Sequence, residues 1–98
     1  MIHRYLTPDD GTFVGEIAYH LDEERAITVA DVIVHAKYRG RGYGRAGLTL
    51  LCQEAKENSV SVLYDDIAVD NPAVTLFLQC GFAAEYRTDK IIMLKKQL

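Results

Sequence analysis

A nine-residue stretch that follows an apolar segment combines repeated glycine with clustered positive charge, a pairing suited to binding a small anion. In order, its relevant residues are Lys37, Arg39, Gly40, Arg41, Gly42, Tyr43, Gly44 and Arg45. Glycine permits positive φ and allows the backbone to approach a ligand closely. Successive backbone amides can then point into one concavity and bind phosphate oxygens. We therefore predict that residues 39–45 bind a pyrophosphate group, with Arg41 and Arg45 adding charge-assisted hydrogen bonds.

The segments on either side of this loop predict a strand before it and a helix after it. Residues 25–34 are rich in β-branched side chains and apolar on both faces, which predicts a central strand covered on both sides. Residues 44–58 carry apolar side chains at the spacing i, i+3, i+4 and i+7, namely Leu48, Leu51, Cys52 and Ala55. The N-terminus of that helix would add about half a positive charge to the loop.

The remaining segments predict an α+β fold of mixed α/β type. Five further strands are expected, at residues 1–6, 12–21, 60–69, 82–88 and 90–96. The last two would form a hairpin. A turn is expected at residues 8–11, and a short helix between Asn71-Pro72 and Gly81. The order is β-β-β-α-β-α-β-β, in one domain spanning residues 1–98.

The loop also allows interpretations other than a pyrophosphate site. A glycine-rich turn with solvated arginine side chains would have the same sequence. Nucleotide-binding loops of two other kinds are disfavoured. No Gly-Lys-Ser or Gly-Lys-Thr follows, as a Walker A loop requires. The glycines at positions 40, 42, 44 and 47 give GxGxG rather than the GxGxxG of dinucleotide-binding folds.

Composition and charge disfavour several classes of protein. The 98 residues are 49% apolar and 26% charged with a net charge of −3, which is typical of a globular domain and not of a nucleic-acid-binding one. The sequence starts without a signal-peptide core and has no apolar run of membrane-spanning length. We therefore expect a cytoplasmic protein with no membrane partner. Cys52 and Cys80 form no CxxC pair, so we expect reduced core cysteines and no metal site.

Two segments together resemble the GNAT superfamily of N-acetyltransferases. Residues 34–44 are similar to motif A of that family, whose R/Q-x-x-G-x-G/A positions are filled by Arg39, Gly42 and Gly44. Residues 71–82 are similar to motif B, commonly N-x-x-A-x-x-L-Y-x-x-x-G-F. The two motifs stand in the family's order, separated by a helix and a strand. The resemblance covers roughly residues 1–96.

This resemblance implies a mostly antiparallel mixed sheet and acetyl-CoA as cosubstrate, with no metal. The backbone of Ile33 and Val34 would hold the pantetheine arm between two parted strands. The loop at residues 39–45 would hold the pyrophosphate, and Asn71 and Phe77 would lie beside the cofactor on the second helix. The acceptor would be a small-molecule or peptide amine.

The sequence departs from the family pattern at two places. Family members often carry a Tyr where this chain has Phe77, so the acid that protonates the departing thiolate is vacant or moved. Tyr43, Tyr64, Tyr86 and Cys80 remain open for that role. The chain also starts at what would be the family's second strand, without the usual first strand and first two helices. Because a bare sheet edge favours pairing, we expect a homodimer or another assembly.

Several side chains could act as the general base that takes a proton from the amine. Asp31 interrupts an apolar strand, and partial burial would raise the pKa of its carboxyl into a useful range. His35 ends the same strand and His20 the previous one, and both titrate near neutral pH. Asp65 and Asp66 fall on opposite faces of their strand and are expected to be solvated or paired.

The sequence thus predicts an N-acetyltransferase in which the amine attacks acetyl-CoA directly in a ternary complex. A backbone amide near Val34 would polarise the thioester carbonyl. Two alternatives stay open. One is a catalytically inactive CoA-binding module that acts as a sensor or assembly partner, and the other is a structural α+β protein with an incidental glycine-rich turn. The identity of the acceptor does not follow from the sequence.

Overall fold

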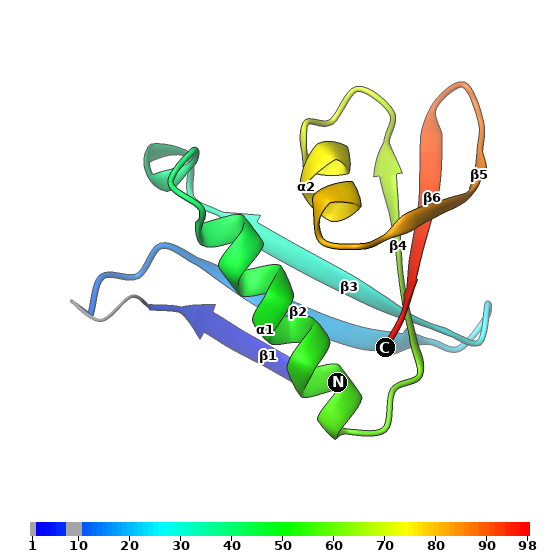
Figure 1. Ribbon diagram of the computed structural model, residues 1–98, viewed down its shortest axis with the longest axis horizontal. Helices are drawn as coiled ribbons and strands as arrows, with labels where there is room; N and C mark the ends of the chain where they lie inside the picture. The colour runs from blue at the N-terminus through cyan, green and yellow to red at the C-terminus, as the bar shows by residue number, and fades with distance from the viewer. Residues whose placement is uncertain (1, 8–10) are drawn as a thin grey trace.

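The chain forms a six-stranded sheet in the order β1-β2-β3-β4-β6-β5, with two α-helices beside it (Figure 1). This computed structural model describes residues 2–7 and 11–98, with side chains from Leu6 onward. The elements are β1 (Ile2–Leu6), β2 (Gly15–Asp22), β3 (Ile27–Val34), the 3₁₀ helix η1 (Ala36–Tyr38), α1 (Tyr43–Glu57), β4 (Val62–Ala68), α2 (Ala73–Gln79), β5 (Ala83–Arg87) and β6 (Ile91–Gln97). The predicted fold class and order of elements are confirmed. Of the turn predicted at residues 8–11, only Gly11 is described, with a φ of 84°.

The contact between β3 and β4 is short and parallel. Every other neighbouring pair of strands in the described sheet is antiparallel. Val29 and Tyr64 are the only residues paired between β3 and β4 within the described ranges. Beyond this pair the two strands diverge (Figure 1). The sheet is therefore open between the C-terminal halves of β3 and β4.

Both helices lie on the same face of the sheet. α1 packs on β2 and β3, and it buries the predicted apolar stripe, Leu48, Leu51, Cys52 and Ala55. A Cβ at Gly47 would lie 3.0 Å from side-chain atoms of Leu6 and Ile17, so the helix approaches the sheet closely. At its N-terminal end α1 meets α2, where a Cβ at Gly44 would lie 3.0 Å from Leu76.

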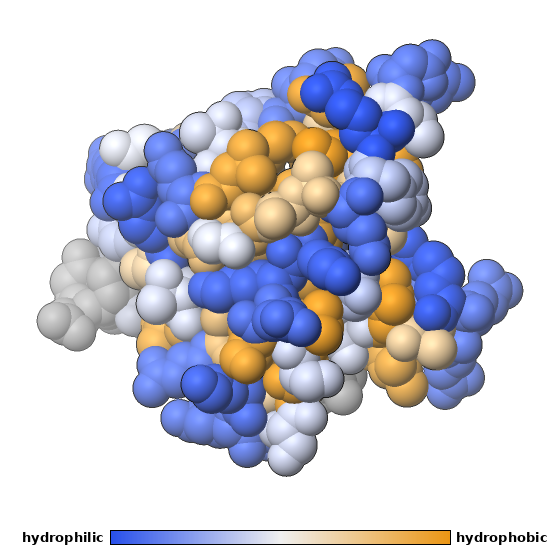
Figure 2. Space-filling view, turned by 45° about the vertical axis from the view of Figure 1, so that its right-hand side comes forward, coloured by the Kyte–Doolittle hydropathy of each residue, from blue (hydrophilic) through white to orange (hydrophobic). Residues whose placement is uncertain are grey.

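The opposite face of β3 is partly uncovered, so the prediction of a strand covered on both sides is wrong. Ala30 is fully buried beneath the helices, whereas Asp31 and Ile33 are exposed. The reason is that both helices lie on the other face of the sheet. On the helices, Leu50 of α1 and Leu78 of α2 are exposed large apolar side chains. Figure 2 shows an apolar area of the surface that is bordered by hydrophilic residues. Burial is thus concentrated in one core between the helices and one face of the sheet.

The two cysteines are free, as expected, with Cys52 buried and Cys80 half-buried. Burial raises the pKa of the Cys52 thiol, and the nearby Lys96 ammonium offsets part of that effect. No cluster of His, Cys, Asp or Glu side chains suited to a metal ion occurs in residues 2–7 and 11–98. In the same part of the chain, no helix has the length and apolar character needed to cross a membrane.

Gly15 and Gly47 are both crowded, but by different kinds of atom, which gives a test of the fold. A Cβ at Gly15 would lie 2.0 Å from the backbone oxygen of Ile33, which cannot move without displacing β3. We expect Gly15→Ala to lower the free energy of unfolding by about 1–3 kcal/mol. Gly47→Ala meets only side-chain ends and gains helix propensity, so it should change that free energy by less than about 1 kcal/mol. Urea unfolding of both variants measures this, and equal losses would contradict the described strand spacing.

Candidate functional site

A pocket of about 670 Å³ opens between the end of β3, the following loop and α2. Its volume is in the range of small-molecule sites in proteins. It is lined by Val32, Ile33, Val34, Tyr38, Arg39, Gly40, Gly42, Tyr43, Gly44, Arg45, Asn71, Pro72, Ala73, Leu76 and Gln79. The pocket therefore joins the glycine-rich loop to the second helix, two segments that are far apart in the sequence.

The backbone amides of the loop are left without partners inside the protein. Gly40 and Gly42 have φ values of 78° and 85°, and Gly42 is the N-cap of α1. The first amide of α1 to donate a backbone hydrogen bond belongs to Ala46, which donates to the Gly42 carbonyl. Within the described ranges, no amide of residues 40–45 donates to a protein acceptor. Six successive donors without a protein acceptor at a helix N-terminus are suited to binding an anion.

The four cations around the loop have different partners. The Arg39 Nε donates to the Val34 carbonyl at 3.1 Å, and the Arg45 guanidinium donates to the Gln79 Oε1 at 2.6 Å. Lys37 and Arg41 instead lie over the ring of Tyr38, at 5.1 and 5.8 Å from its centroid. Neither Lys37 nor Arg41 lines the pocket. The Arg41 side chain therefore lies over Tyr38 and not in the pocket, where it was expected to add a hydrogen bond to the pyrophosphate.

Asn71, just before α2, and Phe77, within it, lie in different environments. The Asn71 Oδ1 accepts a hydrogen bond from the Ala73 amide at 2.9 Å, which caps the start of α2, and Asn71 lines the pocket. Phe77 does not line the pocket. It is 2% exposed and packs edge-on against Phe82 with ring centroids 4.9 Å apart. Without a hydroxyl, this ring is best accommodated in the core, so Phe77 lies away from the place where a cofactor contact was expected.

The backbone of β3 presents alternate residues to the opening between β3 and β4. The carbonyl of Ile33 faces β2, because a Cβ at Gly15 would lie only 2.0 Å from it. The His35 amide donates to the Val14 carbonyl, also on the β2 side. Since hydrogen-bonding directions alternate along an antiparallel strand, the backbone groups of Val32 and Val34 point toward β4. Of the expected pair, Ile33 and Val34, only Val34 therefore directs its backbone groups to the opening, and Val32 does so as well.

Asp65 is the titratable group that sequence reasoning underestimated. It lies on the helix-facing side of β4 between the buried residues Leu63 and Ile67, and its partner on β6 is the fully buried Leu94. Burial, followed by the negative charges of Asp31 and Asp66, raises the pKa of the Asp65 carboxyl to about 8. The sequence contains the pattern that indicates this position. Leu63, Asp65 and Ile67 alternate along the strand, so the carboxylate lies between two core residues on one strand face.

Asp31 and Asp66 lie on the uncovered face, two residues beyond the Val29–Tyr64 pair. Asp31 is exposed, not partly buried as expected. Asp66 accepts a 3.2 Å hydrogen bond from the Arg25 guanidinium, which also pairs with Asp22 at 2.7 Å. The expectation of a solvated or paired carboxylate is therefore met at Asp66, whereas Asp65 is half-buried between apolar residues.

The histidine and tyrosine candidates are spread over the molecule. His35 is half-buried and packs edge-on against Phe13, with centroids 4.8 Å apart, while His20 lies within β2 opposite Val29. Of the three tyrosines left open as acids, Tyr43 lines the pocket, and Tyr64 is half-buried where β3 and β4 meet. Tyr86 is 50% exposed on the β5–β6 hairpin.

Solved structures share this fold. A ribosomal-protein-alanine N-acetyltransferase from Brucella melitensis is 27% identical, with a TM-score of 0.82 over 95% of this chain and 67% of that one. The protein yncA of Salmonella typhimurium, solved with its cofactor acetyl-CoA, is 24% identical, with a TM-score of 0.81 over 92% and 61%. A spermidine N-acetyltransferase from Vibrio cholerae, in complex with CoA and spermine, is 17% identical, with a TM-score of 0.84 over 97% and 64%. The chain thus spans about two thirds of the length of these proteins.

The family itself is shown by the sequence. Residues 2–82 match the acetyltransferase (GNAT) family. This match includes the amide loop, the opening between β3 and β4, and α2. The resemblance inferred from motifs A and B is therefore confirmed, and the chain belongs to the acetyltransferase (GNAT) family.

Proposed function

We propose that this protein is an N-acetyltransferase that transfers the acetyl group of acetyl-CoA to an amine. The observation that carries the proposal is the run of six unpartnered amides, residues 40–45, at the N-terminus of α1 beside the pocket. Such a run fits a pyrophosphate. Membership of an acetyltransferase family supports acetyl-CoA as its source.

Each part of the pocket would hold a different part of the cosubstrate. The amides of residues 40–45 bind the pyrophosphate, and the β4-facing backbone groups of Val32 and Val34 bind the amides of the pantetheine arm. The Val34 carbonyl already accepts from Arg39, so Val34 offers its amide. Asn71 contributes its side-chain NH₂ group, because its Oδ1 caps α2. When bound, the cosubstrate supplies an acetyl group activated as a thioester.

Asp65 would serve as the base that takes the proton of the attacking amine. It does not line the pocket, but it lies one residue beyond Tyr64, where β3 and β4 start to diverge, on the helix-facing side of β4. A pKa of about 8 makes its carboxylate a much stronger base than an ordinary aspartate. We prefer Asp65 to Asp31 and His35 because Asp31 is exposed and the His35 ring packs on Phe13.

The charge around the opening favours an amine that carries a second positive charge. Asp31 and Asp66 lie on the face of the sheet opposite the helices and act electrostatically on Asp65. An acceptor that enters from this face meets negative charge that attracts cations. The acceptors named for two similar proteins, a ribosomal-protein alanine and spermidine, are amines as well.

The inactive CoA-binding module remains a second candidate, supported by the buried Phe77 at the position where the family often has a Tyr. Both functions include the binding of CoA, but only the enzyme would transfer an acetyl group. Release of free CoA in the presence of amines would favour the enzyme, and tight binding without turnover on any amine would favour the module.

The first prediction concerns the amide loop. Gly42→Val should lower the affinity for CoA at least about 100-fold, because a β-branched residue disfavours the positive φ that turns the amides into the pocket. Gly11→Val is the matched control, since Gly11 also has a positive φ and open space but does not line the pocket. Calorimetric titration with CoA measures both. Unchanged affinity in Gly42→Val would refute the loop assignment.

The second prediction concerns Asp65. Asp65→Asn should lower kcat about 100-fold and remove an inflection near pH 8, above which the wild-type carboxylate is formed. Asp66→Asn, which changes an exposed and paired carboxylate, should retain kcat within about 3-fold. It should also shift the inflection to lower pH, because one charge that raises the pKa of Asp65 is removed. Unaltered pH–rate profiles in both variants would exclude Asp65 as the base.

The third prediction concerns stability. The folded-state pKa of Asp65, about 8, lies above its ordinary value of 3.8. The protonated carboxyl therefore makes its full contribution to the free energy of unfolding below about pH 4, and this contribution is lost as the pH rises through about 8. Asp65→Asn should match the wild type at pH 4 and have a Tm about 4–8 °C higher at pH 9. Melting curves at both pH values test this, and the same difference at both would contradict it.

The fourth prediction concerns the acceptor. Steady-state kinetics with 1,4-diaminobutane, butylamine and 4-aminobutanoate should give kcat/KM values that decrease in this order, each step by about 10-fold. Asp31→Asn should reduce the preference for the diamine over the monoamine, while leaving the value for butylamine within about 3-fold. A preference for the carboxylated amine would contradict the role given to Asp31.

A further inference from the structure

The ring of Tyr38 brings two cations together at the rim of the pocket. Both charges lie within the distance at which an aromatic ring attracts a cation, about 6 Å. Tyr38 lines the pocket, and its ring packs edge-on against Tyr43 with centroids 6.5 Å apart. Lys37 and Arg41 are exposed, and no acidic side chain in the described part of the chain pairs with either. Two like charges held on one aromatic ring without an acidic partner are suited to binding an anion.

This anion is not the pyrophosphate of the proposed function. The pyrophosphate fits the amides of residues 40–45, and Gly40 and Gly42 line the pocket whereas Lys37 and Arg41 do not. The other two cations near the loop already have protein partners, Val34 for Arg39 and Gln79 for Arg45. Lys37 and Arg41 therefore remain available to bind a second negatively charged group.

Coenzyme A has such a second group. Its pantetheine arm leads to the pyrophosphate, and beyond the pyrophosphate lies a ribose that carries a 3′-phosphate. In the protein, the cation pair on Tyr38 adjoins the amides of residues 40–45, because Arg41 belongs to that loop and Tyr38 lines the same pocket as its glycines. A phosphomonoester carries almost two negative charges at pH 7, so it matches two cations better than one.

We propose that Lys37 and Arg41, held on the Tyr38 ring, bind the 3′-phosphate of coenzyme A and make the protein selective for CoA over its 3′-dephospho form. The proposal rests on the proposed function, since it requires the same cosubstrate. Tyr38 is a positioning residue in this arrangement, because it holds the two cations and does not itself contact the phosphate.

The test is calorimetric titration of the whole chain with CoA and with 3′-dephospho-CoA. The wild type should bind CoA about 10- to 100-fold more tightly. In the double variant Lys37→Gln, Arg41→Gln the ratio should fall to about 1, while the affinity for 3′-dephospho-CoA stays within about 2-fold of the wild type. Tyr38→Leu should reduce the ratio as well, although both charges are retained, because the ring that holds them is absent.

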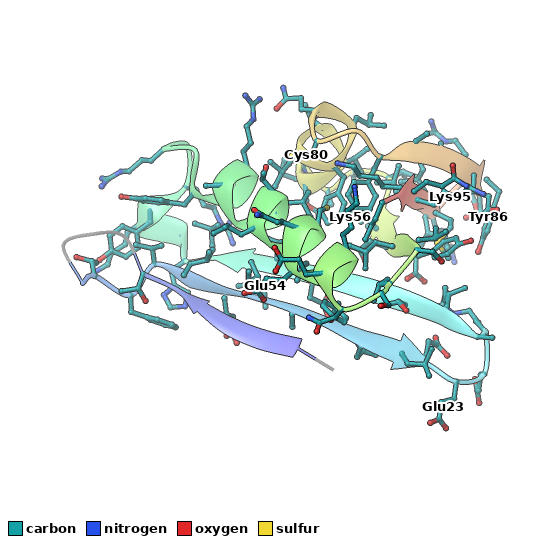
Figure 3. All side chains as sticks on the ribbon, turned by 60° about the horizontal axis from the view of Figure 1, so that its bottom comes forward. Glu23, Glu54, Lys56, Cys80, Tyr86 and Lys95 are labelled. Carbon is teal, nitrogen blue, oxygen red and sulfur yellow. The ribbon has the colours of Figure 1, made fainter. Side chains whose placement is uncertain are left out.

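Lys56→Gln is the matched control for the loss of surface charge. Lys56 lies in the last turn of α1, at the opposite end from the loop at residues 39–45 (Figure 3). This variant should keep the wild-type ratio. A thermal melt of each variant confirms that it is folded before titration.

The possible outcomes separate this inference from the proposed function. If the wild type bound the two ligands with equal affinity, the inference alone would be overturned. The same holds if the affinity of the double variant fell by the same factor for CoA and for 3′-dephospho-CoA. Binding of neither ligand by the wild type would overturn the proposed function and the inference with it.

Discussion

The early divergence of β3 from β4 is the constraint on which the rest of the site depends. These parallel strands are paired only at Val29 and Tyr64 within the described ranges, so the backbone groups of Val32 and Val34 are left facing an opening. The carboxyl end of β3 leads straight into the amide loop, and β4 leads to Asn71 and α2. A longer parallel ladder would close the opening and use the same backbone groups for strand pairing.

Charge is divided between two ends of this opening although the chain as a whole is only mildly acidic, with a net charge of −3. The cations of residues 37–45 gather where β3 ends, together with the positive end of the α1 dipole. Carboxylates gather nearer the point of divergence, where Asp31 and Asp66 act on Asp65. An anionic cosubstrate and a cationic amine would therefore be drawn to different parts of one site.

The site contains features that oppose stability elsewhere in proteins. Gly40 and Gly42 adopt positive φ. Six backbone donors lack acceptors among the residues that the structure describes, and Asp65 lies between core residues of β4 and has a raised pKa. Local departures of this kind tend to occur where a ligand or a reaction requires them. The apolar stripe of α1 and the buried face of β2 and β3 surround them with a regular core, which stabilises the fold as a whole.

Local sequence patterns by themselves determined the order of elements, the buried stripe of α1 and the glycine-rich loop at the start of that helix. Each of these depends on contacts between residues a few positions apart, so period and glycine spacing are sufficient. Only the tertiary structure decided which partner each polar group has. It directed the Ile33 carbonyl toward β2, left Asp31 exposed, placed the half-buried Asp65 opposite Leu94, and placed the Arg41 side chain over the Tyr38 ring. Burial and the partners of charges depend on which elements pack together, and residues distant in the chain supply those elements.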